Sequence, residues 1–186
     1  MVALTSLVVP IVLAAVAVFL ASSIIHMVLG YHRSDYGRVP DEDAMMAALR
    51  GFKLPPGDYF IPMAAGQAQM KDPEFQRRMT EGPRAIVRIL PGGMPAMGAL
   101  LGKWFGFCLV VSLFAAYLAS RTLAPGTPYL TVFRLTSTVA FAGYALATWG
   151  DVIWFDRPVR AVLKSTFDAL VFALLTGGVF GWRWPM

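Results

Sequence analysis

The sequence predicts an all-α integral membrane protein with four transmembrane helices and a small α/β-like cytoplasmic insert between the first two helices. Two observations predict this class. First, 57% of the 186 residues are hydrophobic and 15% are charged, whereas soluble domains carry about a quarter charged residues. Second, all eleven acidic residues, and all but three of the sixteen Lys and Arg, lie in residues 32–103 and 151–168. The apolar runs outside these stretches match a hydrocarbon core of roughly 30 Å.

Four apolar segments are long enough to cross a bilayer. They occupy residues 4–31, 104–123, 129–155 and 166–184. We expect helices, because an isolated span must satisfy its backbone hydrogen bonds internally. The expected organisation is a first transmembrane helix at residues 1–31, an insert at 32–102, and helices two to four at 103–186, all within one compact membrane unit.

The basic residues predict the orientation of the chain. With four spans, the insert shares one side of the membrane with the link after the third span, and the two termini share the other side. Basic residues close to the span ends are concentrated on the insert side: Arg33, Arg38, Lys103, Arg157 and Arg160. Because such residues favour the cytoplasmic side, we expect a cytoplasmic insert and both termini outside.

The insert carries its own helix and strand signals. Asp41, followed by two acidic residues, predicts the capped start of a short helix that ends near Gly51. Asp72 before Pro73 predicts the start of a second helix, with proline at its first position. Short strands are predicted at residues 59–61 and 84–90. The insert is therefore expected to be an ordered cap.

Small residues recur at every fourth position of the last span and form a stripe along one helix face: Ala169, Ala173, Gly177 and Gly181. Such stripes let helix backbones approach closely, which favours helix association in lipid. We interpret the stripe as a packing surface, either within one chain or between two, and we expect a homo- or hetero-oligomer.

The only histidines, His26 and His32, are the candidates for a haem or metal site, because imidazole is a common ligand. They lie six positions apart at one helix end, so we expect that their side chains do not converge on one metal. The interpretation we favour is that His26 bonds to a neighbouring helix and His32 lies at the membrane interface. The single cysteine, Cys108, lies in an apolar run and is expected to be inert. The sequence thus predicts no metal and no cofactor.

Two aspartates lie at the expected cytoplasmic helix ends. Asp168 follows Ser165 by three residues, which is the spacing of a capping box that starts the fourth span. Asp151 is expected to reach water or Lys164. The alternative is a polar pathway, because charges near a hydrocarbon core are costly and often functional. The candidate residues for this pathway are Ser22, His26 and Asp151.

Three arginines lie on the outer side, where no Asp or Glu exists: Arg121, Arg134 and Arg183. Arg134 lies roughly two helical turns inside the third span. A long basic side chain in this position ordinarily extends to lipid phosphate. We expect the three arginines to contact acidic lipid headgroups or a partner subunit.

Four strings of the sequence carry a resemblance to a known family: IHM at 25–27, YHRSDY at 31–36, PPGDY at 55–59 and DPEF at 72–75. Together they resemble an uncharacterised family of bacterial four-span inner-membrane proteins. The resemblance implies a bacterial inner-membrane protein with four spans. It implies no activity, cofactor or catalytic residue.

No nucleophile and base lie at an interpretable spacing, so the leading hypothesis is a non-catalytic polytopic membrane protein, a subunit or scaffold of a membrane assembly. One alternative is transport of an ion or small solute by an oligomer. Another is a haem-, quinone- or lipid-linked membrane enzyme that uses His26 or Asp151. Nucleic acid is not an expected partner, because the basic residues of the insert are interleaved with acidic ones.

Overall fold

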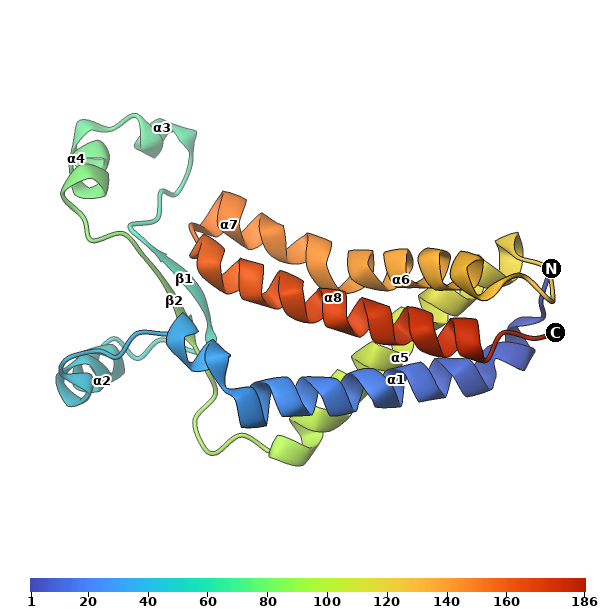
Figure 1. Cartoon of the computed structure of the whole chain (residues 1–186). Coiled ribbons are helices and arrows are strands. Elements are labelled where there is room, and N and C mark those ends of the chain that lie inside the picture. The colour runs from blue at the N-terminus through green and yellow to red at the C-terminus, as the bar shows by residue number, and fades with distance from the viewer. The chain divides into compact units, whose positions relative to one another are not determined.

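The structure is a computed structural model that describes all 186 residues. The chain forms two compact units (Figure 1). One unit combines Met1–Tyr36 with Pro95–Met186, and the other is Gly37–Met94. The predicted insert, 32–102, is therefore wider than the second unit, because the residues that flank Gly37–Met94 pack with the long helices.

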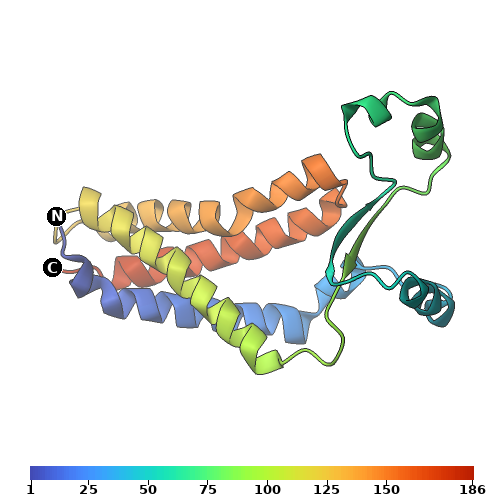
Figure 2. The same ribbon diagram turned by 180° about the vertical axis from the view of Figure 1, so that it is seen from behind.

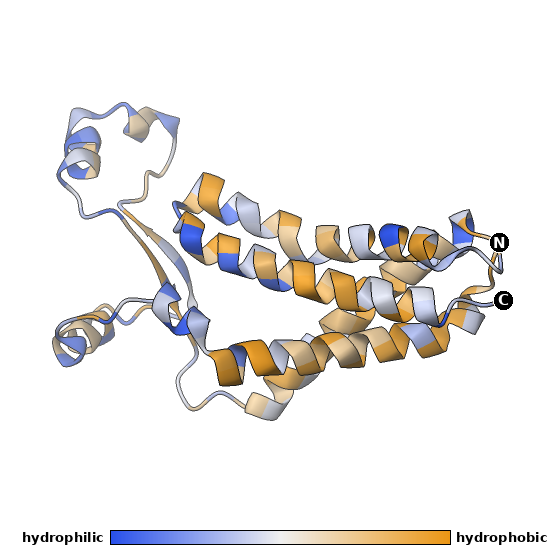
Figure 3. Cartoon of the chain, viewed as in Figure 1, coloured by the Kyte–Doolittle hydropathy of each residue, from blue (hydrophilic) through white to orange (hydrophobic).

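The prediction of four helices long and apolar enough to cross a membrane is confirmed. They run over Leu4–Leu29, Met97–Thr122, Tyr129–Phe155 and Val159–Trp182. Figure 3 shows that these helices are mainly apolar, and that hydrophilic residues gather toward their ends. Both termini lie at the same end of the helical unit (Figure 1).

The first long helix changes its backbone geometry along its length. It begins with a 3-10 turn at Leu4–Leu7, continues as α1 over Val8–Ser23, and widens into a π-helix, η2, over Ile24–Leu29. Gly30, with φ of 59°, ends it in the left-handed conformation that glycine adopts without steric cost. A 3-10 helix, η3, follows at Tyr31–Asp35.

Helix α5 covers Met97–Thr122 and is followed by a short turn. The third long helix comprises α6 at Tyr129–Ala145, a 3-10 turn at Leu146–Thr148 and α7 at Trp149–Phe155. Helix α8, at Val159–Trp182, follows Pro158 directly. It begins seven residues before the predicted start at residue 166, because a helix can continue past the edge of its apolar segment.

This earlier start corrects the prediction for Asp168. With α8 beginning at Val159, Ser165 and Asp168 lie inside the helix and cannot form its N-terminal capping box. Ser165 instead donates a hydrogen bond to the carbonyl of Ala161 (3.2 Å). Asp168 is 4% exposed, so a carboxylate has been placed in the packed interior of the helical unit.

The small-residue stripe packs inside the chain, against α6. A Cβ atom at Gly177 would lie 2.8 Å from the Cβ of Ser137, and a Cβ at Gly181 would lie 2.7 Å from the ring of Tyr129. Ala169 and Ala173 are each 1% exposed. The sequence left open whether the stripe packs within one chain or between two. In the structure it packs within the chain, against α6.

Helix α5 crosses α1 and α8 obliquely (Figure 2) and contacts both α1 and α6. The largest buried cluster lies toward the terminal end of the helices and includes Leu7, Val132 and Phe180, each 0% exposed. A second cluster surrounds Cys108, which is buried and unpaired. These apolar contacts fix the positions of α1 and α8, on which the candidate site is built.

The second unit contains three helices and a two-stranded sheet: α2 at Glu42–Gly51, β1 at Gly57–Ile61, α3 at Gln67–Met70, α4 at Pro73–Glu81 and β2 at Ala85–Ile89. The strands pair antiparallel, with Gly57 opposite Ile89 and Ile61 opposite Ala85. The side chains of Asp41 and Asp72 accept backbone hydrogen bonds at the starts of α2 and α4. Both predicted helices and both predicted strands are confirmed, whereas the short helix α3 was not predicted.

Candidate functional site

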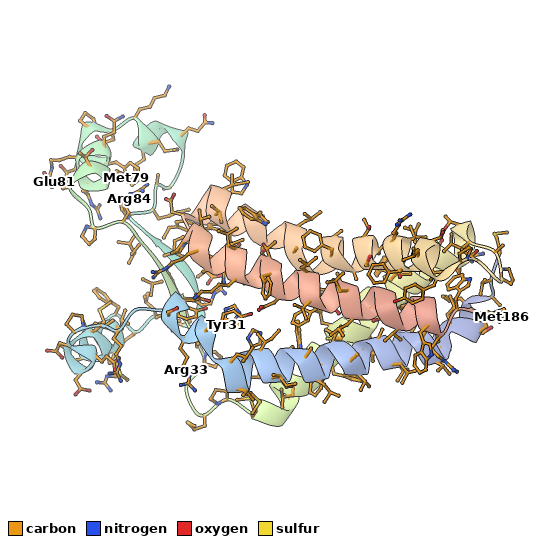
Figure 4. The ribbon with its side chains drawn as sticks, in the orientation of Figure 1. Tyr31, Arg33, Met79, Glu81, Arg84 and Met186 are labelled. Carbon is orange, nitrogen blue, oxygen red and sulfur yellow. The ribbon has the colours of Figure 1, made fainter.

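Two histidines, two carboxylates, a lysine and a tyrosine meet where the first long helix ends and α8 begins. We call this group the His–Asp cluster, and its members are His26, Tyr31, His32, Asp35, Lys164 and Asp168. All six belong to the unit that contains the long helices. Tyr31 is labelled in Figure 4, at the end of the first long helix.

The backbone of residues 24–35 brings the two histidines together. In a regular α-helix, residues six apart point about 120° away from each other and lie about 9 Å apart along the axis. Here the wider π-helix carries His26, and the left-handed turn at Gly30 redirects the chain into the 3-10 helix that carries His32. The ring centroids are 4.8 Å apart. The prediction that these side chains do not converge is therefore wrong.

His32 lies between two buried carboxylates. Its Nδ1 is 2.6 Å from Oδ2 of Asp35, and its Nε2 is 2.7 Å from Oδ2 of Asp168. The carboxylate side chains are 7% and 5% exposed, and the imidazole is 21% exposed. His32 thus joins η3 to α8, and the favoured prediction of a histidine that merely lies at the membrane interface misses both contacts.

The second oxygen of each carboxylate, Oδ1, accepts a hydrogen bond from another side chain of the cluster. The hydroxyl of Tyr31 donates to Oδ1 of Asp168. The Nζ of Lys164 donates to Oδ1 of Asp35 (2.7 Å), to Oγ of Ser34 (2.7 Å) and to the carbonyl of Tyr31 (2.9 Å). Lys164 therefore bonds to residues that follow the first long helix. The expected contact between Asp151 and Lys164 is not formed.

These contacts also shift two pKa values. The ammonium of Lys164, and secondarily His32, hold the pKa of Asp35 below its usual range. Burial raises the pKa of Tyr31 well above its ordinary value, and the hydrogen bond to Asp168 acts in the same direction. At neutral pH, Asp35 is therefore an anion and Tyr31 is a neutral donor, which is the pairing that the hydrogen bonds require.

His26, His32 and Asp168 form a group that could hold a metal ion. One ligating atom from each lies within 4.8 Å of the other two. Atoms that share one ion at about 2.0–2.2 Å lie roughly 3–3.5 Å apart, so Nε2 of His32 and Oδ2 of Asp168, now 2.7 Å apart, would have to separate slightly. His26 would have to move closer to them, and its side chain is exposed and free to do so.

The outer contacts suit this arrangement. Asp35 holds Nδ1 of His32, which leaves Nε2 as the atom directed at Asp168. Tyr31 holds Oδ1 of Asp168, which leaves Oδ2 on the side of His32. Metal-binding histidines characteristically donate their second N–H to a carboxylate, which fixes the tautomer and the ring orientation.

The residues of the predicted polar pathway have separate partners. Ser22 is 2% exposed, and its hydroxyl accepts a hydrogen bond from the indole of Trp104 (2.7 Å). Asp151 is paired with Arg157 at 3.1 Å. Only His26 of the three pathway residues belongs to the His–Asp cluster.

The three outer arginines have different surroundings. The guanidinium of Arg121 lies 5.5 Å from the ring centroid of Tyr117, and that of Arg183 lies 5.3 Å from the ring of Trp182. Arg134 instead lines a surface groove between α5 and α6.

Sequence reasoning missed three members of the cluster: Tyr31, Asp35 and Lys164. Weak local signals exist, since Asp35 follows His32 by three residues and Asp168 follows Lys164 by four, and both spacings place side chains on one helix face. Neither signal indicates that the two pairs face each other across 130 positions of sequence.

No protein-family model, curated protein or solved structure matches this chain.

Proposed function

We propose that this chain is a four-span integral membrane protein that binds a divalent first-row metal ion through His26, His32 and Asp168. In the proposed orientation the Gly37–Met94 unit is cytoplasmic, both termini are outside, and the metal centre lies near the cytoplasmic surface of a bacterial inner membrane.

The outward faces of the long helices support membrane insertion. Large apolar side chains are exposed along them, for example Leu20 at 57%, Phe114 at 63% and Leu174 at 47%. Such a surface suits hydrocarbon and not water, because soluble monomers rarely expose contiguous apolar patches of this extent.

The observation that carries the metal proposal is the second imidazole. A purely ionic network would need only a protonated His32 between the two carboxylates, with Lys164 as the second cation. That interpretation gives His26 no role, although its ring centroid lies 4.8 Å from that of His32. A metal ion gives both rings and Asp168 a common partner.

The donor set indicates the class of metal and the chemistry available. Two imidazoles and one carboxylate suit zinc, iron or manganese better than soft monovalent copper. Three protein ligands leave coordination positions for water or a substrate, as in catalytic rather than structural sites. The chemistry that this centre would supply is Lewis-acid activation of a bound oxygen group at the membrane surface.

The hypothesis of a non-catalytic subunit or scaffold stays a prediction, but its sequence support is weaker. The first support for this hypothesis is a small-residue stripe on α8 that is available to a partner, but in the structure this stripe contacts α6. The second support is an absence of ionisable groups that converge, but in the structure such groups converge on His32. An assembly subunit that carries a metal centre remains compatible with both observations.

Metal titration of the purified full-length protein tests the proposal. Protein in mild detergent is stripped with a chelator and titrated separately with Zn(II), Mn(II) and, without oxygen, Fe(II), and bound metal is measured by mass spectrometry. We expect about one ion per chain for at least one metal, and loss of binding in His32→Ala and Asp168→Asn. Asp35→Asn is expected to weaken affinity by about 10–100-fold. Asp151→Asn is the matched control and should bind normally.

Folding is followed in parallel by circular dichroism, so that loss of metal is separated from loss of structure. Absence of stoichiometric binding by folded wild-type protein for all three metals would overturn the metal centre and leave the ionic network as the explanation. Resistance of the chain to carbonate extraction from membranes tests insertion separately.

A further inference from the structure

A surface groove of about 530 Å³ lies between the end of α5 and the first turns of α6. Its apolar wall comes from Leu118, Leu123 and Leu135. Its polar lining comes from Thr122, Thr131, Arg134 and Thr138. The groove is at the terminal end of the helical unit, away from the His–Asp cluster.

Arg134 brings a positive charge to this groove without an internal counter-ion. Its backbone carbonyl accepts a hydrogen bond from Thr138 (2.7 Å), but its guanidinium makes no hydrogen bond or ion pair within the chain. The last acidic residue before Arg134 is Glu81 and the first after it is Asp151, and both lie outside the segment that forms the groove. An anion supplied from outside the chain is therefore the partner that matches this charge.

The position of Arg134 specifies what kind of anion can reach it. It lies five residues after the first residue of α6, or about 8 Å along the helix. In an inserted protein this depth corresponds to the boundary between the headgroups and the hydrocarbon. The leucines of the groove offer an apolar surface that an acyl chain can contact. A diffusing water-soluble anion would gain nothing from the leucine wall.

We propose that the groove is a binding site for an anionic glycerophospholipid. The phosphate accepts hydrogen bonds from the guanidinium of Arg134 and from the hydroxyl of Thr131, which makes no hydrogen bond to the chain, and one acyl chain lies against the three leucines. This site rests on the membrane insertion proposed above but is independent of the metal centre. It assigns the lipid contact to Arg134 and not to a shared patch with Arg121 and Arg183, whose guanidinium groups lie beside aromatic rings.

The test measures lipid preference in the full-length protein. Wild type and variants in mild detergent are mixed with phosphatidylglycerol or with phosphatidylcholine of the same acyl chains, and retained lipid is counted by native mass spectrometry. We expect a preference of about tenfold for phosphatidylglycerol, because both lipids offer a phosphate but the choline ammonium of phosphatidylcholine offsets part of its attraction to Arg134. Arg134→Gln should abolish the preference, and Arg134→Lys should keep part of it. Arg121→Gln is the matched control and should behave as wild type.

Three results would overturn the lipid site: an equal retention of both lipids by wild type, a preference that survives Arg134→Gln, or a preference that Arg121→Gln removes. Inorganic phosphate is added in a separate arm, and displacement of phosphatidylglycerol by phosphate alone would reassign the groove to a free anion. If the chain is extracted from membranes by carbonate, both the insertion and the lipid site fail. If it resists extraction but shows no preference, only the lipid site fails.

Discussion

Replacing Gly177 by alanine tests the close packing of α6 against α8. The added Cβ would lie 2.8 Å from the Cβ of Ser137 and 2.9 Å from the carbonyl oxygen of Phe133. Neither atom can move by a side-chain rotation, so the two helices must separate or shift. The neighbouring residue Gly178 provides the control, because a Cβ there would meet only the hydroxyl of Tyr129, at 3.8 Å.

The expected magnitude comes from comparing the two alanines. Each substitution gains about 0.5–1 kcal/mol from the better helix propensity of alanine, and this gain cancels in the comparison. Overpacking at Gly177 adds a cost of about 1–3 kcal/mol. Gly177→Ala should therefore be less stable than Gly178→Ala by about 1–3 kcal/mol, while Gly178→Ala should be at least as stable as wild type.

The assay is reversible unfolding of the full-length protein in mixed micelles, with increasing mole fraction of a denaturing detergent and helix content as the signal. Ser137→Gly in the Gly177→Ala background removes one of the two close atoms and should restore part of the loss. Equal stability of Gly177→Ala and Gly178→Ala would refute the close approach of α6 and α8. Dissociation of an oligomer by Gly177→Ala, without a change in monomer stability, would place the stripe at an interface between chains.

Three further outcomes are expected. Trp104→Phe removes the indole hydrogen bond to Ser22 and should lower the free energy of unfolding by about 0.5–1.5 kcal/mol; unchanged stability in the same micelle assay would contradict this. Asp72→Ala removes the N-cap of α4 and should destabilise that helix by about 0.5–2 kcal/mol, seen as faster amide exchange in its first turn and not in α2. The hydrogen bond from Arg88 lowers the pKa of Asp58 in the folded protein. The pair therefore stabilises the fold at pH values above the unfolded-state pKa of about 3.9, and this stabilisation is lost as the pH falls through the lower folded-state pKa. In Arg88→Gln the pKa of Asp58 measured by NMR titration should rise toward its ordinary value, and an identical pKa in both proteins would refute the pairing.

The long helices and the insert elements were predictable because their signals are local. The length of an apolar run is enough to predict a spanning helix. The side chains of Asp41 and Asp72 accept hydrogen bonds from backbone N–H groups within one turn, so the starts of these helices are also encoded locally. Helix boundaries were less predictable. Helix α8 begins at Val159 because the backbone hydrogen-bond ladder continues through polar residues that hydropathy assigns to a loop.

By itself, the sequence determined that four apolar helices of spanning length exist and that the polar insert carries a capped, two-stranded unit. Only the tertiary structure decided which groups meet His32. One reason is distance along the chain, since Asp168 lies 136 positions away and can be placed only by packing of α8. The other reason is helix geometry, because the π-helix and the left-handed Gly30 turn His26 and His32 toward each other. An argument from residue spacing assumes a regular α-helix and therefore cannot predict such a turn.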